Sequence, residues 1–102
     1  LGYGFLEVVY KDAMEVEFLQ RSMNYVREEK HAIEYKGVTL QHKFFADYTL
    51  FSNIIVEVKV NKDGITDDAV AQTLNYLKAS GLRLGLIINF GKSALDYKRL
   101  IF

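Results

Sequence analysis

The sequence predicts an α/β (α+β) domain in which flanking helices pack on a mixed β-sheet. Residues 4–23 and 67–80 repeat apolar side chains at helical spacing. Between them lie three strand-like segments with short connections, which favour an antiparallel meander. Residues 54–90 read as strand, helix and strand, which favours a parallel pair joined by a right-handed crossover. The predicted order is therefore helix–three antiparallel strands–helix–strand, over one domain spanning residues 1–102.

Composition limits the class of protein. Half of the 102 residues are hydrophobic, so the chain can bury a core. It has no cysteine, which excludes disulfides and thiolate metal sites. No apolar run approaches the roughly 18 residues that a membrane span needs. We therefore expect a cytoplasmic location and no membrane partner.

The first helix, over residues 4–23, has an apolar stripe of Leu6, Val9, Ala13 and Val16, which Tyr10, Met14 and Phe18 widen. Residues 25–35 alternate charged and apolar side chains and predict a half-exposed strand. A turn at 35–37 uses Gly37, which is free to adopt a positive φ. The strand at 43–51 is followed by Ser52 and Asn53, which indicate a second turn.

The segment 54–60, IIVEVKV, predicts the third strand, and 61–68 predicts a loop. Asp67 or Asp68 is expected to cap the second helix, and Gly81 to end it. The apolar stripe of this helix is Val70, Leu74 and Leu77. Residues 82–90 form a nearly continuous apolar run, typical of a central strand buried on both faces. The tail KRLIF predicts a short edge strand.

Several polar residues stand where packing alone would not place them. Asp47 interrupts the second strand, and Glu57 and Lys59 interrupt the third. Two carboxylates on neighbouring strands can hold a hard cation such as Mg²⁺. Such an ion polarises a phosphodiester and lowers the pKa of a bound water, while Lys59, on the same strand face as Glu57, can orient that water. Further candidates lie on the two helices: Glu7, Gln72 and Tyr76.

The pattern Asp47…Glu57-x-Lys59 resembles the PD-(D/E)XK nuclease superfamily. Gly4, Glu7 and Tyr10, in GFLEVVY, resemble the GxxExxY motif of a family of small prokaryotic proteins in that superfamily. Four further blocks of that family have counterparts here, in YKG, AD, QTLNYLKASG and LGLIINFG. The resemblance covers essentially the whole chain, and the ordered set of blocks is far more specific than the E-x-K pattern alone.

The resemblance implies a restriction-endonuclease-like core and a metal-dependent phosphodiesterase. Mg²⁺, or Mn²⁺, would bind Asp47, Glu57 and the backbone carbonyl of Val58. Glu7 would be a further acidic residue of the site, which can reach the metal through a water. Lys59 would be the catalytic lysine. Gln72 and Tyr76 match the QxxxY motif of RecB-like branches, where it supports the site and contacts substrate. The implied partner is nucleic acid, DNA rather than RNA. The family has more helix before the motif glycine, so we expect the first helix to begin before Leu1.

Ordinary structural roles compete with these assignments. Glu57 with Lys59 could be a solvated ion pair, Glu7 could pair with Lys11 one helical turn later, and Gln72 with Tyr76 could cover a helix flank. His31 and His42 lack ligand-like spacing and are expected at the surface or in packing. A net charge of zero also favours a second class of function. In that alternative, the same fold is a non-catalytic module that binds nucleic acid or protein, or forms a homodimer.

The metal hypothesis makes a geometric prediction about the second hairpin. A two-residue turn at Ser52 and Asn53 would place Asp47 opposite Val58, and Glu57 would then point to the other face. A shared metal therefore requires a loop of odd length, such as three residues, or a β-bulge between positions 47 and 57.

Overall fold

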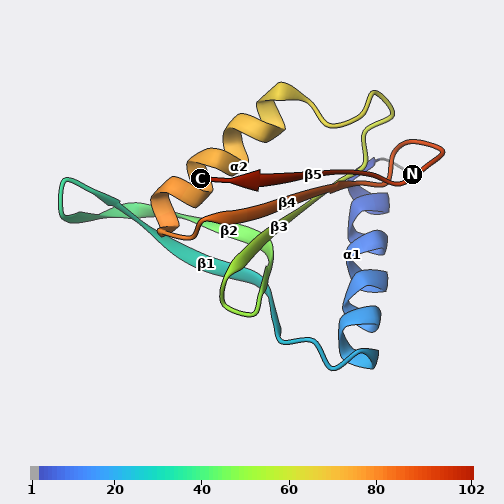
Figure 1. Cartoon of the computed structure of the whole chain (residues 1–102), viewed down its shortest axis with the longest axis horizontal. Coiled ribbons are helices and arrows are strands. Elements are labelled where there is room, and N and C mark those ends of the chain that lie inside the picture. Colours follow the sequence, from blue (N-terminus) through green and yellow to red (C-terminus); the bar gives the residue numbers. More distant parts are fainter. Residues whose placement is uncertain (1–2) are drawn as a thin grey trace.

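The structure, a computed structural model, describes residues 3–102. In this range the elements are, in order, α1 (Tyr3–Gln20), β1 (Tyr25–Tyr35), β2 (Val38–Leu50), β3 (Ile54–Lys59), α2 (Asp67–Ser80), β4 (Leu84–Asn89) and β5 (Asp96–Ile101) (Figure 1). The predicted order of helix, three strands, helix and strand is confirmed, and the tail adds the expected edge strand.

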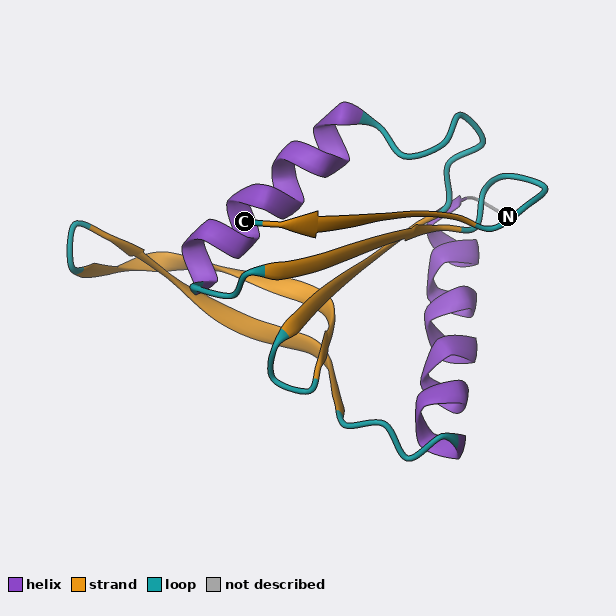
Figure 2. Ribbon diagram, in the orientation of Figure 1, coloured by secondary structure: helices purple, strands orange, loops and turns teal. Residues whose placement is uncertain are grey.

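The described strands form one mixed sheet in the order β1-β2-β3-β4-β5 (Figure 2). β1, β2 and β3 pair antiparallel, as the short connections predicted. β3 and β4 pair parallel through the α2 crossover, and β5 returns antiparallel to β4. The central strand β3 therefore has one antiparallel and one parallel neighbour.

Alternate residues of β3 point to different helices, as the pleat of a strand requires. Ile55 packs in one core cluster with Leu77 of α2. Val56 and Val58 pack in a second cluster with Phe18 of α1. The two helices therefore cover opposite faces of the sheet, and Glu57, between two α1-side valines, belongs to the α2 side.

The predicted apolar stripe of α1 is wrong. Leu6, Val9, Ala13 and Val16 are exposed, and the side facing the sheet carries Tyr10, Met14 and Phe18 together with two charged residues, Glu7 and Lys11. Tyr10 stacks on Phe90, with ring centroids 4.4 Å apart. Because α1 is apolar on nearly every side, helical spacing alone could not identify its buried face.

The two largest differences between predicted and observed element boundaries have local causes. α1 ends at Gln20 instead of residue 23, because Ser22 adopts a left-handed φ of 53° and the Met23 N–H donates to the Phe18 carbonyl at 2.9 Å. β2 begins at Val38 instead of residue 43, because the tight turn at Gly37 pairs Val38 with Tyr35.

Two predictions for the second half of the chain are also corrected. Thr66 caps α2 instead of Asp67 or Asp68, and its hydroxyl accepts a hydrogen bond from the Ala69 N–H at 3.1 Å. β4 is not buried on both faces. Its residues alternate between buried and half-buried, because α2 covers its inner face and α1 leaves the other face partly open.

Asn89, at the end of β4, is fully buried and holds the segment that follows β3. Its side chain donates to the Asn61 carbonyl at 2.8 Å and accepts from the Asn61 N–H at 2.8 Å. It also accepts from the Gly91 N–H at 3.1 Å. Asn61 starts the loop that lines the cavity described below, so these bonds fix one wall of that cavity.

Gly91→Ala is expected to lower the free energy of unfolding by about 1–3 kcal/mol, the usual effect of overpacking. A Cβ at Gly91 would lie 2.3 Å from the backbone of Asn61, which the Asn89 side chain holds by two hydrogen bonds. Urea denaturation measures the change. Gly4→Ala in α1 is the control, because nothing lies within 4 Å of its added Cβ. Equal stability of both variants would contradict this packing.

Neither α1 nor α2, the helices in the described part of the chain, is long and apolar enough to cross a membrane. The two histidines behave as predicted. His31 stacks on Phe44, with ring centroids 5.0 Å apart, and hydrogen-bonds to Thr49, while His42 is exposed.

Candidate functional site

Asp47 and Glu57 lie where β2 and β3 separate. The β2–β3 pairing covers Tyr48 with Val56 and the two pairs nearer the loop, and the next positions in this register are Asp47 and Glu57. The connecting loop is three residues long, 51–53. The odd loop length that the metal hypothesis required is therefore confirmed, and Asp47 and Glu57 (hereafter the carboxylate pair) are neighbours across two strands.

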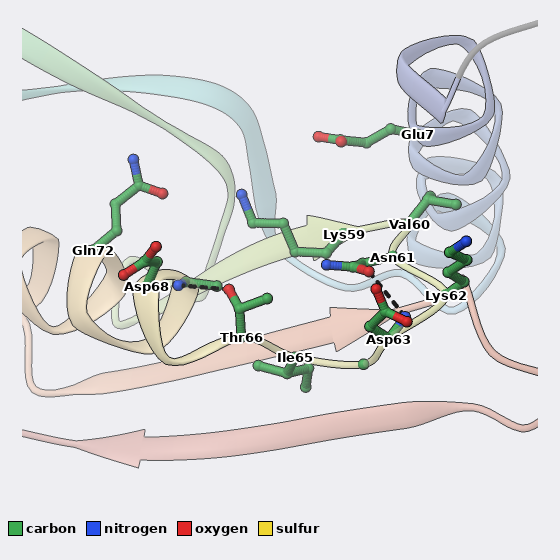
Figure 3. A pocket seen from close by; sticks show the side chains of 12 residues that line it. Glu7, Lys59, Val60, Asn61, Lys62, Asp63, Ile65, Thr66, Asp68 and Gln72 are labelled. Carbon is green, nitrogen blue, oxygen red and sulfur yellow. Dashed lines mark hydrogen bonds between the residues drawn. The ribbon is translucent and has the colours of Figure 1, made fainter.

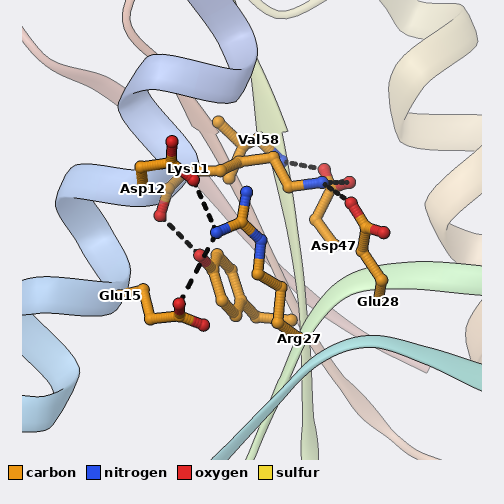
Figure 4. Close-up of polar contacts among 8 residues, drawn as sticks. Lys11, Asp12, Glu15, Arg27, Glu28, Asp47 and Val58 are labelled. Atoms are coloured by element: carbon orange, nitrogen blue, oxygen red, sulfur yellow. Dashed lines mark hydrogen bonds and ion pairs between the residues drawn. The ribbon is translucent and has the colours of Figure 1, made fainter.

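Two donors hold the Asp47 carboxylate (Figure 4). The backbone N–H of Val58 donates to Oδ2 at 2.7 Å, and the Lys11 ammonium donates to Oδ1 at 3.0 Å. Beyond the last pair of β2 and β3, Tyr48 with Val56, the Val58 N–H is thus bonded to the Asp47 side chain instead of to a backbone carbonyl of β2. The N–H and C=O of one strand residue point to the same side, so the Val58 carbonyl is also turned toward Asp47.

Glu57 is a buried carboxylate without a full set of partners. Its exposed fraction is 5%, and Oε1 has no hydrogen-bond partner among the described residues. Burial, followed by the negative charge of Asp47, raises the pKa of Glu57 to about 8. A buried polar atom left unpaired is unfavourable, and a cation placed against it would remove that penalty.

Lys59, two residues after Glu57, lines a cavity of about 600 Å³ together with Glu7 and Gln72 (Figure 3). The loop after β3 and the first turn of α2 complete its walls. Partial burial and then the charge of Asp47 raise the pKa of Glu7, while Lys59 and Lys11 act in the opposite direction. The carboxylate pair does not line this cavity. Lys59 and Glu7 line it and also lie near the carboxylate pair, so they link the cavity to that pair.

Gln72 and Tyr76, one turn apart on α2, lie in different surroundings. Gln72 is exposed and lines the cavity. The Tyr76 ring stacks on Phe44 at a centroid distance of 4.1 Å and an interplanar angle of 2°, within the α2-side core. Burial, followed by the charges of Glu57 and Asp47, raises the pKa of Tyr76. Tyr76 therefore borders the carboxylate pair from the core.

Sequence reasoning missed the roles of Lys11 and Glu28. The i, i+4 pair of Glu7 with Lys11 is not among the ion pairs of the described residues. The Lys11 ammonium instead bonds to Glu28 of β1 at 2.9 Å and to Asp47. Burial lowers the pKa of Lys11, but the bonds to these two carboxylates outweigh it and leave that pKa raised. The available signal was a lysine on the motif face of α1, one turn after Glu7.

The donor set suits a hard divalent cation. Within the described residues, no three side chains of the Asp, Glu, His or Cys type gather as a metal cluster. The site offers two carboxylates and, on the same side of β3, the Val58 carbonyl. Mg²⁺ commonly binds through one or two carboxylates and keeps several waters. The unpartnered Oε1 of Glu57 supplies the further observation that such an ion fits here.

The solved structure described as the crystal structure of SSO0001 is similar to this chain, with a TM-score of 0.69 and 15% sequence identity. The match covers 96% of this chain and 52% of that chain, so the present chain spans about half the length of that relative. At this identity the likeness establishes the fold alone. No curated protein matches the chain.

The model of the PD-(D/E)XK nuclease superfamily matches residues 1–100. This match and the solved structure agree with the mixed sheet and its two helices, which form the expected restriction-endonuclease-like core. Because the family match spans nearly all of the sequence, the chain belongs to the PD-(D/E)XK nuclease superfamily.

Proposed function

We propose that the chain is a Mg²⁺- or Mn²⁺-dependent nuclease of the GxxExxY family, built as one domain over residues 1–102. Asp47, Glu57 and the Val58 carbonyl hold the ion, and Lys59 acts on the water nucleophile. The observation that carries this proposal is the buried Glu57 carboxylate, which has an unpartnered oxygen beside Asp47. The substrate is nucleic acid, as membership of a nuclease superfamily suggests.

The charges around the carboxylate pair favour one divalent cation. Four carboxylates and two ammonium groups act on one another here. They belong to Glu7, Glu28, Asp47 and Glu57, and to Lys11 and Lys59. The Arg27 guanidinium also acts on Glu28, but it is already paired with Asp12 and Glu15. With the other six groups ionised, two negative charges are left, which one divalent ion neutralises. A divalent cation would be attracted to this excess of negative charge.

Each residue of the proposed site has a defined role in this mechanism. When bound, the ion supplies Lewis-acid activation of the phosphodiester and of a water. Lys59 donates hydrogen bonds that orient the attacking water and offset the charge that develops on the phosphate. Glu7 faces Lys59 across the cavity and limits where that ammonium can lie. Gln72 contacts the substrate from α2, and Tyr76 supports Glu57.

Substrate recognition depends on a few local groups. The net charge is zero, so bulk electrostatics do not supply the affinity. Lys59 and Lys62 line the cavity and are placed to meet phosphates of the backbone. We propose DNA in preference to RNA, and matched DNA and RNA oligonucleotides of one sequence test this choice.

Millimolar Mn²⁺ is expected to raise the melting temperature of the protein. A ligand that binds only the folded state stabilises it by about 2.7 kcal/mol at a concentration 100 times its dissociation constant. Differential scanning fluorimetry with and without EDTA measures the shift. Asp47→Asn and Glu57→Gln should each remove it, while Glu17→Gln, at an exposed ion pair, should keep it.

The alternative function is a protein-binding module, a homodimer in its simplest form. The specific observation in its favour is the exposed apolar face of α1, formed by Phe5, Val8, Val9, Val16 and Leu19. Exposed apolar residues gathered on one face of a helix commonly mark an interaction site. This alternative would be favoured if Mn²⁺ leaves the melting temperature unchanged and if the molecular mass in solution is twice the chain mass.

A further inference from the structure

Lys11 is a buried lysine whose ammonium joins two strands. Its exposed fraction is 6%, and Nζ lies 2.9 Å from Glu28 Oε1 and 3.0 Å from Asp47 Oδ1 (Figure 4). The hydroxyl of Tyr48 donates to the backbone carbonyl of Lys11, so the helix turn that carries the lysine is itself fixed to β2. A buried charge requires such partners.

Glu28 is placed for this contact by an unusual backbone. Its φ is +54°, in the left-handed region that residues other than glycine rarely adopt, and it lies inside a strand. The flanking pairs, Arg27 with Tyr48 and Glu29 with Ala46, put Glu28 directly across from Asp47. Conformations of this kind persist where surrounding contacts enforce them and are common at functional sites.

Glu28, Asp47 and Glu57 therefore stand at matching positions on three adjacent strands. Lys11 contacts the first two and leaves the third without a partner on Oε1. Asp47 is held from α1 by Lys11 and from β3 by the Val58 N–H at 2.7 Å. These two bonds fix the direction of its carboxylate relative to Glu57.

We propose that Lys11, anchored by Glu28, is a positioning residue that aligns the Asp47 carboxylate with Val58 and Glu57. The inference deepens the proposed function, because the aligned carboxylate is the one assigned to the metal. It predicts that Lys11 acts through Asp47 and does not itself contact substrate. The roles of Lys11 and Lys59 are thus distinct, although both are lysines near one site.

A competing role for Lys11 is that of a simple counter-ion, and it predicts the opposite effect on metal binding. The ammonium repels a nearby cation, so removing a mere counter-ion strengthens metal binding. Removing a residue that orients a ligand weakens metal binding, by 10–100-fold in typical cases. The sign of the change in affinity therefore separates the two roles.

The first test needs no metal. In Lys11→Met, amide hydrogen exchange followed by NMR is expected to show at least about a 10-fold loss of protection at Val58 relative to Val56, because the Val58 acceptor is no longer held. A general loss of stability would affect both amides equally. Glu28→Ala, at a side chain that is 60% exposed, should give a smaller loss in the same direction. Unchanged protection of Val58 relative to Val56 in Lys11→Met overturns the proposal.

The second test is Mn²⁺ affinity by titration calorimetry. Lys11→Met is expected to bind Mn²⁺ about 10–100-fold more weakly, and Lys30→Met, at an exposed lysine, should bind like the parent chain. Tighter binding by Lys11→Met overturns the proposal. If the parent chain itself binds no Mn²⁺, the proposed function fails, and Val58 exchange still decides whether Lys11 positions Asp47.

Discussion

Asp47→Asn and Glu57→Gln are each expected to lower Mg²⁺-dependent cleavage of nucleic acid by about 10³-fold or more. Each removes a charged oxygen ligand, and the electrostatic stabilisation of the transition state by the ion is lost with it. Lys59→Met is expected to cost about 10²–10³-fold through the loss of one charged donor at the reacting phosphate. The measurement is initial cleavage rate on labelled oligonucleotides at saturating Mg²⁺.

The controls separate chemistry from folding and from contaminating nucleases. Glu17→Gln changes an exposed i, i+4 pair with Arg21 and should retain full activity. All variants should keep a cooperative thermal transition. Cleavage that survives in purified Asp47→Asn at the parent rate would contradict the metal assignment. Loss of cleavage in Lys59→Met with unchanged Mn²⁺ binding would support a role for Lys59 in the chemical step.

The condition under which Asp47 and Glu57 lie side by side could be predicted from the sequence. The period of a strand is two residues, so the parity of a hairpin loop decides which side chains face together. Asp47 and Glu57 could share a site only if the loop had an odd length, and the structure has a three-residue loop at 51–53. The order of the elements was predicted for a similar reason, since turn residues and strand periodicity are local properties.

Contacts between distant elements could not be predicted in the same way. Lys11 meets Glu28 and Asp47, which lie 17 and 36 positions away in the sequence. The nearest local alternative was an i, i+4 pair of Lys11 with Glu7. Lys11 is instead buried between α1 and the sheet, where Glu28 and Asp47 are its partners. The predicted orientation of α1 was wrong because the helix is apolar on nearly every side. Its buried face is selected by tertiary packing, such as Phe18 against Tyr48 and Tyr10 against Phe90.

Gln72 and Tyr76 show how two residues of one sequence motif can have different surroundings. Its spacing from Gln72 suggested one shared surface, but the ring stacks on Phe44 while Gln72 lines the cavity. The residues are one turn apart, but Gln72 lies beside the loop that follows β3, whereas Tyr76 lies against Phe44 of β2. A sequence pattern reports the spacing on the helix, whereas the neighbours of each side chain depend on the sheet.

Glu57→Gln is expected to stabilise the metal-free protein at pH 8, although it removes one of the proposed metal ligands. The pKa of Glu57 in the folded chain is raised to about 8, first by burial and then by Asp47. A raised folded-state pKa means that folding favours the protonated form. The contribution of that form is fully present below the unfolded pKa of about 4.5 and is lost as pH rises toward 8. The neutral glutamine avoids this loss.

The expected gain at pH 8 is about 1–3 kcal/mol, which is part of the full effect of the raised pKa, since one pKa unit corresponds to about 1.4 kcal/mol. For a chain of this size, each kcal/mol raises the melting temperature by about 4–8 °C. Thermal unfolding in EDTA at pH 4 and pH 8 measures it, and the two proteins should differ at pH 8 alone. Equal stability at pH 8 would mean that Glu57 is already compensated in the metal-free chain.

Saturating Mn²⁺ should reverse the order of stability, because the parent chain gains binding energy that Glu57→Gln cannot. The same carboxylate is then unfavourable without the ion and favourable with it. A buried acid retained at this cost in stability is typical of a functional site, where stability and activity place opposite demands on one residue. An unchanged order in Mn²⁺ would assign the cost of Glu57 to something other than metal binding.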